Sequence, residues 1–194
     1  MNAYYPQITT SASMLDSIVK IEELSTALQS YERVSVAITD RKLYGLLPFY
    51  KEMKRHDLHA VLGLTVKMTV SDELDLPFIL YAKNEIGYQH LIKISSAISL
   101  REREDLPLNW LNGYKEGLSL MIPLVNLLPS EECESAILQI ANLFEESIYL
   151  GMERVHGVPT EQEPYWIEFA EKHQIKIAMT HEVRFINEDD VEAF

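Results

Sequence analysis

The feature that most constrains the fold is a strand that runs into a polar corner and then a helix, at residues 34–45 (V-S-V-A-I-T-D-R-K-L-Y-G). Val34, Val36 and Ile38 alternate with other residues in the way that is typical of a short, buried strand. Asp40 follows directly, and ligands and catalytic groups gather at the carboxyl ends of strands in parallel α/β proteins. Asp40 is therefore a candidate site residue, while ordering of the turn is the other interpretation.

The same pattern of strand and helix repeats along the chain. Strands are expected at residues 3–10, 34–38, 58–66, 76–82, 118–124, 147–152 and 175–179. Amphipathic helices are expected at 18–31, 45–55, 84–94 and 130–144, and a last one opens at a capping box, 160–163. Residues 100–114 are predicted to be a loop with one helical turn near Trp110. Strands that alternate with helices predict a parallel sheet with right-handed crossovers, either open or closed into a barrel.

The composition indicates one globular domain. The chain has 194 residues, of which 47% are hydrophobic and 24% charged, enough for one core and too few for two comfortable domains. No run approaches the roughly 18 apolar residues of a membrane span, and the first residues lack the layout of a signal peptide. The single cysteine, Cys133, excludes an internal disulfide framework and fits a reducing compartment. We expect a cytoplasmic protein without membrane contact.

The charge of the chain argues against nucleic-acid binding by this chain alone. It carries 30 acidic and 17 basic residues, a net charge of -13. A protein that grips phosphates shows the opposite electrostatic footprint. The pattern also stops abruptly at residues 191–194, so we expect a fragment of a longer protein.

Five motifs, in order along the chain, carry a family resemblance. Residues 39–45 resemble T-D-H-G-N-M-Y-G, and residues 82–91 resemble A-K-N-E-x-G-Y-x-x-L. Residues 13–16 resemble S-L-L-D, residues 45–50 resemble G-x-x-x-F-Y, and residues 188–193 resemble P-E-D-A-E-A. The chain thus resembles the PHP (polymerase and histidinol phosphatase) domain of bacterial DNA polymerase III alpha subunits of the DnaE type.

The resemblance implies a single PHP-like domain over residues 1–194, folded as a distorted (β/α)7 barrel with its metal site at the carboxyl ends of the strands. In that family His, Asp, Glu and Cys hold up to three ions, a ligand set that suits a metal-dependent phosphoesterase. The opening H-x-H of the family falls on Gln7 and Thr9, and the histidine after T-D falls on Arg41. The glutamate of the third strand falls on Thr65.

The remaining ligand positions are equally altered. The histidine that opens the fourth strand falls near Pro77, the cysteine after the fifth falls near Leu124, and the closing N-D-x-H falls on residues 181–184. Only Asp40 and Glu182 keep a ligating character, and arginine stays protonated and repels a cation. We therefore expect a degenerate site with no metal, no other cofactor and no catalytic residue.

The vestigial positions are Gln7, Thr9, Asp40, Arg41, Thr65, Glu182 and Arg184. Asp40, Glu182 and Arg184 are expected to project toward the same end of the fold. Arg184 is predicted to pair with Asp40 or Glu182 within about 4 Å, in place of the lost ion. If that pair is partly buried, replacing Arg184 by alanine is expected to cost about 3 kcal/mol.

The resemblance implies a catalytically inactive structural and interaction module of a DNA-directed DNA polymerase, whose polymerase activity lies outside this chain. The implied partners are the palm and thumb of the same subunit and other replisome components, with DNA contacted only through the full-length subunit. One alternative is an active PHP phosphoesterase or proofreading 3′–5′ exonuclease, with metal held by Asp40, Glu182, His181 and a further histidine. Another is an unrelated (β/α) barrel or amidohydrolase-like enzyme. His56 and His59 have an H-x-x-H spacing without a third nearby ligand.

Overall fold

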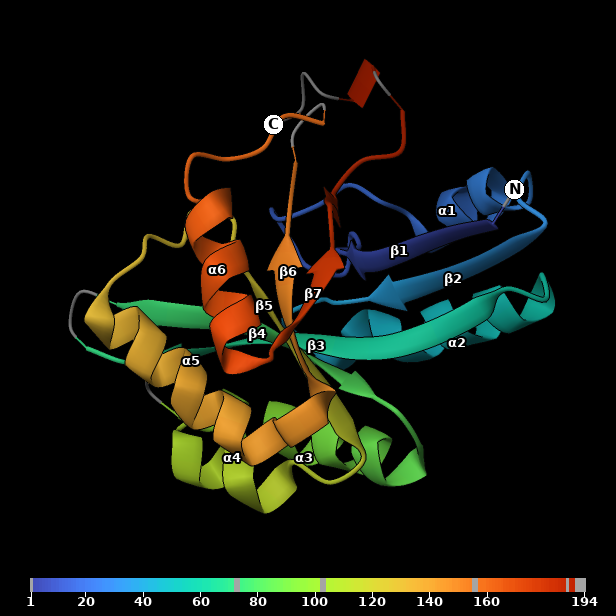
Figure 1. Ribbon diagram of the computed structural model, residues 1–194. Coiled ribbons are helices and arrows are strands. Elements are labelled where there is room, and N and C mark those ends of the chain that lie inside the picture. The colour runs from blue at the N-terminus through green and yellow to red at the C-terminus, as the bar shows by residue number, and fades with distance from the viewer. Residues whose placement is uncertain (1, 72–73, 102–103, 155–156, 188, 191–194) are drawn as a thin grey trace. The chain divides into compact units, whose positions relative to one another are not determined.

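The computed structural model describes residues 2–71, 74–101, 104–154, 157–187 and 189–190 (Figure 1). The chain divides into two compact units. Unit 1 comprises residues 1–64 and 181–194, and unit 2 comprises residues 65–180. The motif resemblance at residues 188–193 falls largely outside the described residues.

Unit 1 is built on parallel strands in the order β8-β1-β2-β3. The strands are β1 (Asn2–Ile8), β2 (Arg33–Ile38), the first part of β3 (His59–Thr69) and the short β8 (Glu182–Val183). Its helices are α1 (Ile21–Leu28), the 3-10 helix η1 (Leu43–Gly45) and α2 (Leu46–Arg55). Parallel pairing places the carboxyl ends of β1, β2 and β8 at the same edge of this unit.

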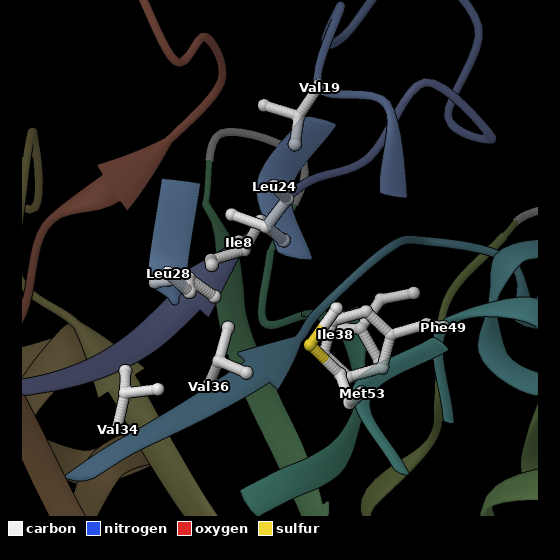
Figure 2. Packing of buried hydrophobic residues seen from close by; sticks show 9 residues of the cluster. All are labelled: Ile8, Val19, Leu24, Leu28, Val34, Val36, Ile38, Phe49 and Met53. Carbon is white, nitrogen blue, oxygen red and sulfur yellow. The ribbon is translucent and has the colours of Figure 1, made fainter. Parts of the chain in front are cut away.

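The core of unit 1 lies between its strands and its two α-helices (Figure 2). Leu24 and Leu28 of α1 and Phe49 and Met53 of α2 point into the same apolar cluster as the side chains of β1 and β2. The buried members are Ile8, Val19, Leu24, Leu28, Val34, Val36, Ile38, Phe49 and Met53. Burial of this many branched and aromatic side chains, each contributing about 1.5–3 kcal/mol, fixes the strands against the helices.

Unit 2 continues from the last part of β3 in the strand order β3-β4-β5-β6-β7. Its strands are β4 (Asp75–Ala82), β5 (Leu118–Pro123), β6 (Ile148–Met152) and β7 (Lys176–Met179). Its helices are α3 (Glu85–Ser99), α4 (Leu108–Tyr114), α5 (Glu131–Phe144), the 3-10 helix η2 (Glu145–Ser147) and α6 (Glu163–His173). Strands β5, β6 and β7 are parallel, whereas β4 is antiparallel to β5.

The expectation of an all-parallel sheet is wrong at β4. Only five residues, 70–74, separate β3 from β4, and the backbone N–H of Val70 donates to the carbonyl of Leu74 at 2.8 Å. A parallel crossover needs a connection of about a dozen residues or more, so this link has no room for a helix. The described residues also contain an eighth strand, β8, which the sequence pattern did not indicate because it is only two residues long.

Two helices, α3 and α5, begin at a residue whose side chain caps them, whereas α1, α2, α4 and α6 have no side-chain hydrogen bond at the N-cap. Asn84 accepts a hydrogen bond from the N–H of Gly87 at 3.0 Å, and Ser130 accepts one from Cys133 at 3.1 Å, as N-caps do. The predicted capping box at residues 160–163 is wrong, because α6 begins at Glu163 and its N-cap makes no side-chain hydrogen bond. The predicted loop at residues 100–114 contains the seven-residue helix α4 rather than a single turn.

The α/β class expected from the sequence is confirmed by the order of elements. Within the part of the chain that the structure describes, no helix combines the length and the apolar character needed to cross a membrane.

Candidate functional site

The candidate site lies in unit 1, where polar residues follow the carboxyl ends of the parallel strands. Thr9 and Thr10 come directly after β1, Asp40 comes two residues after β2, and Glu182 opens β8. The backbone N–H of Thr39 donates to the carbonyl of Ile8 at 2.8 Å, which ties the end of β2 to the end of β1. Adjacent strand ends therefore bring these side chains together, as expected for a parallel arrangement.

Asp40 is enclosed by the loop that follows β1. It is 2% exposed, and its Oδ1 accepts hydrogen bonds from the backbone N–H of Thr10 at 2.6 Å and the hydroxyl of Ser13 at 3.0 Å. Its Oδ2 accepts the hydroxyl of Thr10 at 2.6 Å. Three donors thus occupy the two oxygens of this carboxyl group, and all three are electrically neutral.

The surroundings of Asp40 favour its protonated form. Burial raises the pKa of Asp40 above its ordinary value, because little water is present to solvate the anion. The hydrogen bonds from Thr10 and Ser13 act in the opposite direction, and the nearby carboxylate of Asp16 adds to the increase.

Gly45 packs closely over the same carboxyl group. A Cβ atom at this position would lie 3.0 Å from each of three atoms: Ala12 Cβ, Asp40 Oδ2 and Thr10 Oγ1. Contacts this short are tighter than ordinary Cβ contacts, so a side chain here would push its neighbours away by a few tenths of an ångström. The Tyr-Gly end of η1 therefore completes the enclosure of Asp40.

Glu182 is held by a second, more open set of contacts. Its Oε1 accepts the hydroxyl of Thr9 at 2.8 Å, and its Oε2 accepts Nη2 of Arg184 at 2.8 Å. The side chain of Arg184 is 44% exposed and that of Glu182 is 25% exposed. The ion pair predicted for Arg184 is thus confirmed, with Glu182 as the partner, but it lies near the surface.

The other vestigial positions are distributed as follows. Gln7 is buried in β1 and pairs in register with Glu182. Arg41 lies 3.6 Å from the carboxylate of Asp16, measured from its Nε, and is largely exposed. Thr65 belongs to unit 2 and is half-buried in β3. Among the seven predicted positions, Thr9 and Arg184 each contact Glu182 directly.

Sequence reasoning missed the residues that hold Asp40, namely Thr10 and Ser13. The available signal was the run of small polar residues after β1 (T-T-S-A-S, residues 9–13), which offers several hydroxyl donors at a strand end. The positions of Thr10 and Asp40 are 30 residues apart, so no local pattern could have paired them.

These donors are a poor match for the ions of a metal-dependent hydrolase. Within the described residues, no group of three or more His, Cys, Asp or Glu side chains is placed to hold a metal ion. Threonine, glutamine and arginine, which stand at predicted ligand positions, lack the imidazole nitrogens that such a centre uses, and both oxygens of Asp40 and Glu182 already accept hydrogen bonds. No reaction step can be built through a metal on these residues.

The two histidines with H-x-x-H spacing lie elsewhere in unit 1, near the amino ends of its strands. His56 contacts Gln29 at 3.0 Å and Glu52 at 3.1 Å, and His59 contacts the hydroxyl of Ser35 at 3.0 Å. Both histidines line an open, polar hollow of about 620 Å³. Each ring has a protein partner, so the interpretation as surface histidines suffices.

Solved structures define the class of fold. An amidohydrolase from Chromobacterium violaceum matches with a TM-score of 0.66, covering 96% of this chain and 89% of that one at 10% sequence identity. A candidate metal-dependent phosphoesterase from Bifidobacterium adolescentis matches with a TM-score of 0.58 over 92% and 86% of the two chains, again at 10% identity. At such low identity these matches show the fold alone, which is that of PHP-like proteins and confirms the predicted fold.

The family follows from the sequence comparisons. A family model described as the PHP domain matches residues 7–154, and the chain belongs to this family. The DNA polymerase III alpha subunit of Bacillus subtilis is 29% identical over 206 residues, covering 100% of this chain and 18% of the relative. That of Haemophilus influenzae is 30% identical over 201 residues, covering 95% and 17%. The chain thus spans less than a fifth of the length of these relatives, and the predicted resemblance to their PHP domain is confirmed.

Proposed function

We propose that the chain is the PHP domain at the amino-terminal end of a bacterial DNA polymerase III alpha subunit, and that its role there is structural. The family and the names of the relatives support the first part. DNA replication and a cytoplasmic location follow from that assignment. Polymerisation itself belongs to parts of the subunit outside this chain.

One observation supports a structural role over a catalytic one. Both oxygens of Asp40 accept hydrogen bonds from Thr10 and Ser13, and both oxygens of Glu182 accept them from Thr9 and Arg184. A hydrolytic metal centre needs carboxylate lone pairs that face a cation and an open position for water. In this site, neutral hydroxyls and a guanidinium group take the place that a cation would need.

The main partner is then the rest of the same subunit, with other replisome components as further candidates. The net charge of -13 makes retention of DNA by this chain alone unfavourable, because binding at physiological salt depends on neutralising phosphates. Contact with DNA would occur through the full-length subunit.

A second candidate is a metal-dependent phosphoesterase or proofreading exonuclease. It is favoured by the fold alone, since one neighbour of similar fold is described as a metal-dependent phosphoesterase.

An activity assay separates the two functions. The purified chain would be incubated with Mn²⁺ or Zn²⁺ and with either p-nitrophenyl phosphate or a primer that ends in a mismatched nucleotide. We expect hydrolysis no faster than with Asp40→Asn, which keeps the shape of the side chain but removes the anionic ligand. Hydrolysis that requires metal and disappears in Asp40→Asn would establish the phosphoesterase instead.

A further inference from the structure

Two large apolar side chains lie almost fully exposed at the loop between β1 and α1. Met14 is 84% exposed and Leu15 is 97% exposed. Single exposed apolar residues are normal on protein surfaces, whereas larger exposed apolar areas mark interaction sites, and two neighbouring residues at a loop tip together expose more apolar area than one. We call these two residues the loop tip.

The loop that carries this tip is held in one conformation. The N–H of Ser13 donates to the carbonyl of Thr10 at 2.9 Å, the N–H of Asp16 donates to that of Ser13 at 3.0 Å, and the hydroxyl of Ser13 donates to Asp40 at 3.0 Å. Leu15 has a φ of 69°, a left-handed conformation that is unfavourable for leucine. Strain of this kind persists where the surrounding contacts enforce it, and it is concentrated at functional sites.

A second exposed apolar pair starts next to this loop. Tyr44 in η1 is 78% exposed and Leu47 in α2 is 54% exposed, and their spacing of three places them on one helical face. Gly45, between them, lies against Ala12 of the loop, since a Cβ there would be 3.0 Å from the Cβ of Ala12. The segments that carry the two pairs thus touch at Gly45 and Ala12, and we call the four residues of both pairs the apolar docking surface.

A covalently linked partner suits this surface better than a second copy or a membrane. A chain with a net charge of -13 repels copies of itself and the anionic surface of a bilayer. The relatives contain this region as only 17–18% of their length, so most of a subunit of that kind lies outside this chain. A partner within the same polypeptide binds at a high effective concentration, so a small, rigid apolar surface is enough.

We propose that Met14, Leu15, Tyr44 and Leu47 form the surface on which the remainder of the polymerase subunit docks, an inference that rests on the proposed function. In this arrangement Asp40 acts as a positioning residue, because its bond to Ser13 holds the loop that presents the tip. A side chain that stands where the family has a metal ligand thereby organises an interface.

Thiol labelling in the full-length subunit tests this surface. Leu15→Cys is compared with Leu100→Cys, a matched control at an 89% exposed leucine of unit 2, and labelling by a maleimide is read for each residue by peptide mass spectrometry. The native Cys133 is buried and its pKa is raised to about 11, so it labels slowly. We expect position 15 to label at least about tenfold more slowly than position 100 in the native subunit, and both to label equally after unfolding in urea.

Equal labelling of the two positions in the native subunit would overturn the docking surface. A photo-crosslinking amino acid at position 15 identifies the occupant. A cross-link to a peptide of the same chain supports the proposal, whereas cross-links only to another copy or to another protein overturn it.

Two measurements other than thiol labelling show whether the proposed function is wrong. If the gene product ends near residue 194, the mass of the purified protein shows that no subunit surrounds this chain. If the chain is a phosphoesterase, the hydrolysis assay shows it while the labelling result stands on its own.

Discussion

Two buried carboxyl groups, one in each unit, are held in opposite ways. Asp40 in unit 1 and Glu163 in unit 2 are 2% and 4% exposed, and each is held by residues that follow the carboxyl end of a strand. Neutral donors surround Asp40, whereas Nε of Arg154 donates to both oxygens of Glu163, at 3.0 and 3.1 Å. Burial raises the pKa of Asp40, while the hydrogen bond from Arg154 lowers the pKa of Glu163.

The difference bears on the replacement of a metal ion that the sequence predicted for unit 1. A guanidinium group neutralises Glu163, as we expected an arginine to do at the vestigial site. Arg41 and Arg184 instead lie near the surface with Asp16 and Glu182, and the loop after β1 reaches Asp40 with hydroxyl and N–H groups. Asp40 therefore keeps its place through hydrogen bonds, without a compensating charge.

The largest expected effect comes from deleting the buried acceptor. Asp40→Ala leaves the N–H of Thr10 and the hydroxyls of Thr10 and Ser13 without their partner, and we expect a loss of about 3 kcal/mol in the free energy of unfolding. Urea denaturation measures it. Asp16→Ala is the control, since its contact with Arg41 is exposed and should contribute less than about 0.5 kcal/mol. A loss as small as that of the control would show that the enclosure of Asp40 does not stabilise the fold.

A tighter test of the enclosure is Gly45→Ala. The added methyl group would meet Ala12, Asp40 and Thr10 at 3.0 Å, and overpacking of this kind costs roughly 1–3 kcal/mol. Gly113→Ala is the matched control, because nothing lies within 4 Å of a Cβ at that position. Chemical denaturation of both variants gives the comparison, and equal stability of the two would contradict the close packing over Asp40.

The opposite pKa changes predict opposite pH dependences. A raised folded-state pKa means that the contribution of Asp40 is fully present below the unfolded value of 3.8 and is lost as the pH rises through the folded value. A lowered pKa means that the contribution of Glu163 is present above 4.5 and is lost as the pH falls through its folded value. Relative to Asp40→Asn, the wild-type chain should therefore gain stability on acidification, and relative to Glu163→Gln it should lose stability.

Unfolding by urea at several pH values between neutrality and pH 3.5, in wild type and both variants, measures these differences. The stability difference between wild type and Asp40→Asn could change with pH in the same direction as the difference between wild type and Glu163→Gln. That result would show that the two carboxyl groups are held in the same way.

The smallest effect is expected at the surface pair. Arg184→Ala should cost about 0.5 kcal/mol, because the side chains of Arg184 and Glu182 remain partly in water. This is well below the roughly 3 kcal/mol that the sequence led us to expect for a partly buried pair, because at these exposures the carboxylate of Glu182 would still be solvated after the loss of Arg184. Lys20→Ala, which removes a similar exposed pair with Glu23, should give a comparable change in the same denaturation assay. A loss several times that of Lys20→Ala would mean that Arg184 has a role similar to that of Arg154.

Much of the fold could be predicted from local pattern, because hydrophobic periodicity is written into neighbouring residues. The alternation in Val34, Val36 and Ile38 predicted a buried strand, and these side chains are buried in β2. The pattern failed where a global constraint decides, as at the five-residue link between β3 and β4, which is too short for the parallel crossover that the alternation of strands and helices predicted. It also failed at Glu163, whose side chain binds Arg154 rather than completing a capping box.

The location of the candidate site could be predicted better than the hydrogen-bond partners of its residues. Asp40 lies just past β2, as strand direction predicted, whereas Glu182 opens β8, a strand that the sequence pattern did not indicate. The contacts of Asp40 with Thr10 and Ser13 depend on the packing of a loop 27–30 residues away in the sequence, which no local motif encodes. The packing of Gly45 over Asp40 is likewise a tertiary contact.

The central claim is that Asp40 organises the loop after β1 and does not ligate a metal. Equilibrium dialysis of the purified wild-type chain and of Asp40→Asn against Mn²⁺ or Zn²⁺, followed by elemental analysis, tests it most directly. We expect no stoichiometric ion on either protein, because three donors already occupy the oxygens of Asp40. A stoichiometric ion on the wild-type chain that is lost in Asp40→Asn would contradict the account.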